Sequence, residues 1–114
     1  MAFTAAGTAS TIYRGRNQFQ GLWNDMFAVT ITSANPSSIA AGAEDTQTYT
    51  IAGLALGDMV LGISFSLDVT INADIQASVS AANTLTIRIS NLNGSTALDL
   101  AAGDFKVLIA RPSF

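Results

Sequence analysis

The sequence predicts an all-β domain, a small antiparallel β-sandwich or barrel with an extended N-terminal arm. Short segments alternate apolar and polar residues with a period of two, and turn-forming residues separate them about every 8–12 positions. No long stretch shows the 3.6-residue period of an amphipathic helix. With 114 residues the chain is long enough for one domain whose core needs neither metals nor disulfides.

The first 25 residues are predicted to be the arm, and residues 26–114 the β domain. The first 24 residues carry two arginines and no acid, a charge of +2, whereas residues 25–114 carry three basic and eight acidic groups, a charge of −5. The arm lacks strict alternation, and this charge difference marks it as chemically separate.

Aromatic and arginine side chains gather in this arm, and these residue types carry much of the binding energy at protein interfaces. We therefore predict a partner-binding role for five residues: Tyr13, Arg14, Arg16, Phe19 and Trp23. The alternative is that Phe19, Leu22 and Trp23 fold back onto the core of the domain as a first strand or a short helix.

Within the β domain, six segments have the length and pattern of strands. They are residues 26–32, 46–51, 59–65, 75–79, 84–90 and 105–110. The clearest is TLTIRIS, in which Leu85, Ile87 and Ile89 share one face. Asn93-Gly94 is a strong turn signal because both residues tolerate positive φ.

The segment MVLGISF, residues 59–65, is apolar on both faces, which is typical of a strand buried on two sides. Charged residues make up only 11% of the chain, against roughly 25% in ordinary soluble domains. We therefore predict a homo-oligomer in which Met59, Leu61, Ile63 and Phe65 form the self-association surface. The alternative is a monomer whose surface is coated by Thr and Ser.

Catalytic and cofactor chemistry find little support in the sequence. The chain has no cysteine and no histidine, which removes the thiol nucleophile, the commonest general base and the commonest zinc ligand. The sole lysine, Lys106, is predicted on the outward face of a regular strand. The acids fall at predicted turns or strand ends, where backbone hydrogen bonding explains them. We predict that the protein is not an enzyme, holds no metal or other cofactor and takes no small-molecule substrate.

Nucleic acid and membranes are not predicted partners either. Beyond the two arginines of the arm the chain is acidic and would repel phosphate. The longest charge-free run, residues 26–43, contains Thr, Ser, Asn and Pro and is too polar to cross a bilayer. The start of the chain, MAFTAAGTAS, lacks the basic and apolar regions of a secretory signal.

The C-terminal part carries a family resemblance over about 65 residues. It begins with TYTIAGLALGDMVLGISFS and continues, after a bend, with ASVSAANTLTIRISNLNGSTALDLAAGDFKVLIARP. These phrases resemble a small β-domain of tailed-bacteriophage virion structural proteins. The matching parts are Tyr49–Gly57, Asp58–Phe65, Val79–Ile89, Asn91–Ser95, Asp99–Gly103 and Phe105–Ala110. The chain departs from the pattern in its low charge and in its own N-terminal segment.

The resemblance implies a capsid decoration (cement) protein that binds the major capsid protein, stabilises the head and associates as a trimer. It implies location on the capsid surface of the virion after assembly in the host cytoplasm. The alternative within the same resemblance is a tail-fibre, knob or other receptor-binding component. A glycan-degrading virion enzyme is the third hypothesis.

Overall fold

The computed structural model describes residues 2–15, 22–69 and 72–113 of the chain, and its regular structure is all β. The described strands are β1 (Thr8–Gly15), β2 (Trp23–Ala34), β3 (Glu44–Thr50), β4 (Met59–Phe65), β5 (Ala73–Ala81), β6 (Thr84–Asn91) and β7 (Gly103–Pro112). The predicted fold class is confirmed, and each of the six predicted strands has its counterpart here.

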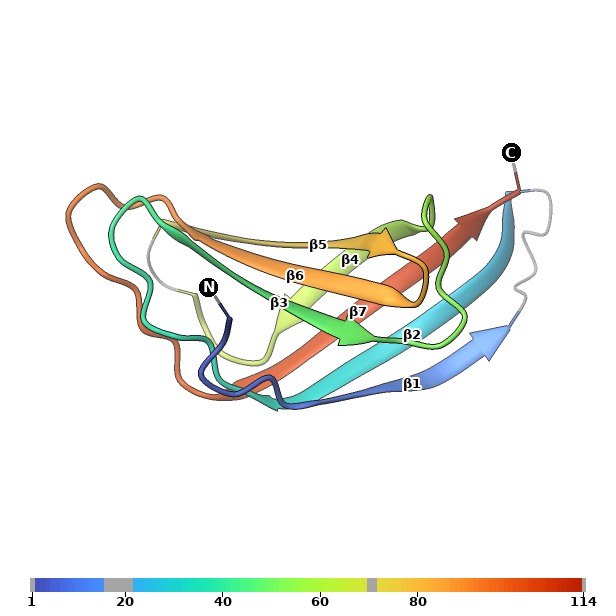
Figure 1. The fold of residues 1–114 in the computed structure, drawn as a ribbon, viewed down its shortest axis with the longest axis horizontal. Helices are drawn as coiled ribbons and strands as arrows, with labels where there is room; N and C mark the ends of the chain where they lie inside the picture. The colour runs from blue at the N-terminus through green and yellow to red at the C-terminus, as the bar shows by residue number, and fades with distance from the viewer. Residues whose placement is uncertain (1, 16–21, 70–71, 114) are drawn as a thin grey trace.

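Two antiparallel sheets form the two layers of a sandwich (Figure 1). One sheet has the strand order β1-β2-β7-β4 and the other β3-β6-β5. The strands of the two layers cross obliquely in Figure 1. The chain changes layer between β2 and β3, β3 and β4, β4 and β5, and β6 and β7. Most neighbouring strands are therefore distant in sequence.

The core lies between the layers and is built by alternation along the central strands. β2 contributes Phe27, Val29 and Ile31, β6 contributes Leu85, Ile87 and Ile89, and β7 contributes Phe105, Val107 and Ile109, all buried. Successive side chains of a strand point to opposite faces, so these i, i+2 sets all face inward. The sequence prediction of inward residues is confirmed for these three strands.

The described residues 2–15 of the predicted arm belong to the sandwich. Thr8–Gly15 pair with β2 as an edge strand, with a bulge between Thr11 and Tyr13. Phe3 is buried, and its ring stacks on Phe105 with centroids 6.2 Å apart. The physical reason is that Phe3 buries apolar surface in the core and β1 satisfies its backbone groups against this chain's own sheet.

β4 is not buried on both faces within one chain, and the prediction assigns burial of its second face to a contact with another copy. It is an edge strand of the four-stranded sheet, and Met59, Leu61 and Gly62 are exposed in the single chain. A bulge between Val60 and Gly62 interrupts its register with β7. A bulge shifts the alternation by one residue. The side chains of residues 59–65 therefore do not alternate regularly between the two faces of the sheet.

Candidate interaction surface

The outward side of the four-stranded sheet is an exposed surface of mainly apolar residues, which we call the apolar face. Its described members are Ile12, Met26, Ala28, Thr30, Met59, Leu61, Gly62, Ser64, Asp104, Lys106 and Leu108. Ile12 is 67% exposed, and Met59, Leu61 and Leu108 are each more than 40% exposed. A cluster of exposed large apolar side chains on one sheet face indicates an interaction surface.

Strand register arranges the middle of this face in cross-strand rows. Leu108 of β7 lies between Ala28 of β2 and Gly62 of β4. In the next row Lys106 lies between two small hydroxyl residues of the same flanking strands, Thr30 and Ser64. β7 therefore presents two long side chains, and the strands on either side present short ones.

A shallow depression of about 530 Å³ follows from this arrangement. It is lined by Ile12, Ala28, Val29, Thr30, Gly62, Ile63, Ser64, Lys106, Val107 and Leu108. A Cβ added at Gly62 would meet nothing within 4 Å, so the floor is open at this position. The depression is apolar with one cation at its side, and it offers a partner a recess next to a protruding leucine.

The outward side of the three-stranded sheet is chemically different, and we call it the hydroxyl face. Its middle row joins Thr48, Thr86 and Ser78, and the Thr86 hydroxyl is 2.8 Å from the hydroxyl of Ser80. On this face, Nε of Arg88 lies 3.6 Å from Oε2 of Glu44. These groups hydrogen-bond readily to water, so only the apolar face combines exposure with apolar chemistry.

The structure divides the four predicted self-association residues into two pairs. Met59 and Leu61 are exposed at the β4 edge of the apolar face. Ile63 and Phe65 follow the bulge, pair with Val107 and Phe105, and pack against the core. The rings of Phe65 and Phe105 are 4.6 Å apart. Ile63 and Phe65 therefore pack against the sandwich core. Of the four predicted self-association residues, Met59 and Leu61 are the two that are exposed.

The structure describes the backbone positions of three of the five predicted partner-binding residues. Tyr13 and Arg14 lie on β1, where they pair with Ala28 and Phe27 of β2. Trp23 begins β2 opposite Pro112 and is half-buried. Arg16 and Phe19 lie outside the described residues, so their predicted role stays a prediction.

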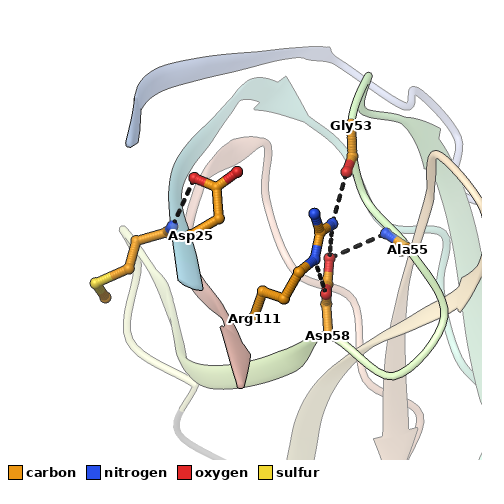
Figure 2. Close-up of polar contacts among 6 residues, drawn as sticks. Asp25, Gly53, Ala55, Asp58 and Arg111 are labelled. Carbon is orange, nitrogen blue, oxygen red and sulfur yellow. Dashed lines mark hydrogen bonds and ion pairs between the residues drawn. The ribbon is translucent and has the colours of Figure 1, made fainter. Parts of the chain in front are cut away.

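The strongest described ionic contact is a pair that ties β7 to the loop before β4 (Figure 2). Arg111 donates from Nε to Asp58 Oδ1 at 2.8 Å and from Nη2 to Asp58 Oδ2 at 2.9 Å. Nη2 also donates to the Gly53 carbonyl at 2.8 Å, and the Ala55 backbone N–H donates to Asp58 Oδ2 at 2.9 Å. Figure 2 shows these groups converging on the loop.

This contact has the character of a structural clamp. The hydrogen bond to Asp58 raises the pKa of Arg111, burial opposes this, and the nearby charges of Asp58 and Asp25 add to it. Arg111 also lies over the Phe27 ring, 5.8 Å from its centroid. Both carboxylate oxygens of Asp58 accept hydrogen bonds from within the chain, so this pair is engaged in holding the loop.

Asp45 of β3 is a second buried acid. It is fully buried, Oδ2 accepts a hydrogen bond from the Ser37 backbone N–H at 3.2 Å, and Oδ1 has no described partner. Among the described residues, no three carboxylates come together as a metal-binding group. Nor do these residues include a helix long and apolar enough to cross a bilayer.

Sequence reasoning missed the centre of the apolar face, although part of its signal was present. Alternation in FKVLIA places Lys106 and Leu108 on the face of β7 that points away from the core. Alternation in MFAVTIT likewise places Ala28 and Thr30 on the face of β2 that points away from the core. The missing information was that these strands are neighbours. Their pairing joins residues about 80 positions apart, which the local pattern does not encode.

Comparisons with family models, with curated proteins and with solved structures find no match to this chain.

Proposed function

We propose that this chain is a structural protein of a phage particle, a capsid decoration (cement) protein that binds the major capsid protein and stabilises the head. The proposal joins the resemblance carried by Asp58–Phe65 and Val79–Ile89 to the surface chemistry of the sandwich. In this role the protein acts by binding, and more than one copy takes part in each attachment.

The observation that carries the proposal is the difference between the two outward faces. The hydroxyl face suits solvent, whereas the apolar face exposes Ile12, Met59, Leu61 and Leu108. Burial of apolar surface contributes roughly 25 cal/mol per Å² to association. A structural subunit in an assembly has such a surface to bury, and an isolated soluble domain gains nothing from it.

Attachment to a capsid is repeated at many symmetric positions, so individually modest contacts become effective through multivalency. In this proposal the apolar face joins copies of the chain, and the first strand with the segment after it contacts the capsid. Tyr13, Arg14, Arg16, Phe19 and Trp23 are the proposed contact residues. The +2 charge of the first 24 residues suits a partner with acidic groups.

Co-sedimentation of the purified protein with phage heads that lack it tests the proposal. The double variant Arg14→Ala/Arg16→Ala should bind at least about tenfold more weakly, the loss expected for truncating interface arginines. Arg88→Ala is the matched control, because Arg88 is a half-exposed arginine of the hydroxyl face and should leave binding unchanged.

Equal binding by the double variant and the original chain would reject these arginines as capsid contacts. Cryo-electron microscopy of the particle then decides the location. Density for the chain on the head supports decoration, whereas density on the tail supports the alternative of a tail-fibre, knob or receptor-binding component.

A further inference from the structure

We propose that the apolar face is covered by the apolar face of a second copy of this chain, packed sheet against sheet. This inference deepens the proposed function by naming the surface that joins the copies. It rests on that function only for its biological setting, because self-association can be measured without any capsid.

Shape is the first argument for a second copy. Sheets that pack face to face interdigitate their side chains at a separation of about 10 Å, with large residues opposite small ones. The apolar face carries both halves of this match, since Leu108 protrudes and the position of Gly62 beside it is open. A two-fold axis in the interface plane would place each copy's Leu108 over the other copy's Gly62. A surface that holds both the knob and the hole is self-complementary.

Charge is the second argument. Among the side chains that the structure describes on this side of the sheet, the charged ones are Lys106 and Asp104, neighbours on the outward side of β7. They line one shallow depression together with Ser64 and Ser66. The surface is therefore neutral in sum, and two copies can meet with the cation of one beside the anion of the other. A capsid protein in the same place would need charges of its own that complement Lys106 and Asp104.

Size is the third argument. A face of four strands about 4.8 Å apart and about eight residues long measures roughly 19 by 27 Å, or about 500 Å² in projection. Two such faces bury at least about 1,000 Å² together, which is the lower limit of specific protein interfaces. The hydroxyl face of each copy stays in solvent on the outside of the pair.

A contact of this kind closes as a dimer, because each copy uses the same surface and none is left for a third. The trimer that the family resemblance implies would need contacts between two different surfaces. The mass of the particle in solution therefore separates the two arrangements.

Sedimentation velocity and light scattering on the full chain, from about 1 to about 100 µM, test the inference. The original chain should form a dimer in this range, the affinity expected of an interface at the lower end of the size range. Gly62→Val should weaken the dimer at least about tenfold, because the added side chain occupies the recess that receives Leu108. Inside a single chain its Cβ meets nothing within 4 Å.

Gly94→Val is the matched control. Gly94 lies in the loop after β6, where an added Cβ also meets nothing within 4 Å. This variant should dimerise as the original chain does. Leu108→Ser is a second interface variant, and far-ultraviolet circular dichroism should show the same β-sheet signal in all of these proteins.

A monomer or a trimer throughout the concentration range would overturn the inference, as would a Gly62→Val dimer of unchanged affinity. If Gly62→Val instead abolished head binding by a monomeric chain, the capsid would be the occupant of the apolar face. If the original chain dimerises as expected but fails to bind heads, the dimer stands and the proposed function fails.

Discussion

Asp58 and Arg111 depend on each other at the scale of single residues. The Asp58 side chain is 2% exposed and the Arg111 side chain 29%, so the carboxylate relies on its partner in place of water. Removing one member of a buried pair leaves an uncompensated charge, which costs more than the net value of the intact pair. The clamp therefore makes the position of loop 51–58, and with it the start of β4, sensitive to either side chain.

Tyr49 provides a residue-scale prediction of pH dependence. Burial raises the pKa of Tyr49 from 10.0 to about 12, and its hydroxyl donates to the Ala6 carbonyl at 2.8 Å. Below pH 10 both the folded and the unfolded chain hold this proton. Between pH 10 and about 12 the unfolded chain releases it first, so the free energy of unfolding falls as pH rises.

We expect Tyr49 to account for a loss of about 2 kcal/mol between about pH 8 and about pH 11.5 in urea unfolding. Tyr49→Phe should be about 1 kcal/mol less stable near neutral pH, because it loses the hydrogen bond, and should lack this part of the alkaline loss. Tyr13→Phe, the other tyrosine variant, should retain it. Equal alkaline losses in Tyr49→Phe and the original chain would contradict the prediction.

At the scale of elements, the segment before β1 closes one side of the sandwich. Ala5 and Asn35 exchange two backbone hydrogen bonds of 3.0 and 2.8 Å, and Phe3 reaches the core. Gly7 makes the turn from this segment into β1 with φ 78°. A Cβ at Gly7 would lie 2.2 Å from the carbonyl oxygen of Thr32, so glycine is required for space as well as for conformation.

Gly7→Ala should therefore lower the free energy of unfolding by at least about 3 kcal/mol, the sum of a positive-φ cost and a backbone clash. Gly42→Ala is the matched control, because Gly42 has a similar φ of 74° and open space around its Cβ position. Gly42→Ala should lower the free energy of unfolding by only about 1 kcal/mol. Chemical denaturation measures both, and similar losses would mean that the clash at Gly7 is relieved by small shifts.

Prediction from sequence succeeded for elements whose pattern is local. The inward sets of β2, β6 and β7 are visible as alternation in the sequence. Residues 8–15 fall in the predicted arm, since TASTIYRG does not alternate strictly. They form the strand β1 because they pair with β2. Pairing of this kind stabilises an edge strand irrespective of its own propensity.

The candidate site was less predictable because it depends on register and on strand order. The run 59–65 showed that apolar side chains were available, but not that a bulge after Val60 turns Ile63 and Phe65 inward. Leu108 became part of a surface only through its neighbours Ala28 and Gly62, which come from distant segments. Such non-local facts are set by the packing of the whole sandwich, not by any one strand.

At the scale of the whole molecule, the sandwich has two unlike outward faces around one core. The chain is acidic overall with a net charge of −3, yet the apolar face is neutral in sum among its described side chains, Asp104 and Lys106 included. Long-range repulsion therefore acts between whole molecules, whereas the contact surface itself offers little resistance to pairing. Added salt should screen that repulsion and favour association.

Thermal unfolding connects the proposed dimer to the stability of the molecule. When two folded copies unfold to two separate chains, mass action makes the melting temperature rise with protein concentration. Two copies of 114 residues have an unfolding entropy of roughly 480 cal/mol/K, so each tenfold increase in concentration should raise Tm by about 3 °C.

The original chain and Gly94→Val should both show this slope between about 2 and about 200 µM, the range over which a dimer of micromolar affinity forms. Gly62→Val should melt at nearly the same temperature across the range and below the original chain at the highest concentration, because it unfolds from the monomer. Calorimetry or circular dichroism measures the slope. A concentration-independent Tm in the original chain would mean that its stability comes from one sandwich alone, and a rising Tm in Gly62→Val would place the joining surface elsewhere on the molecule.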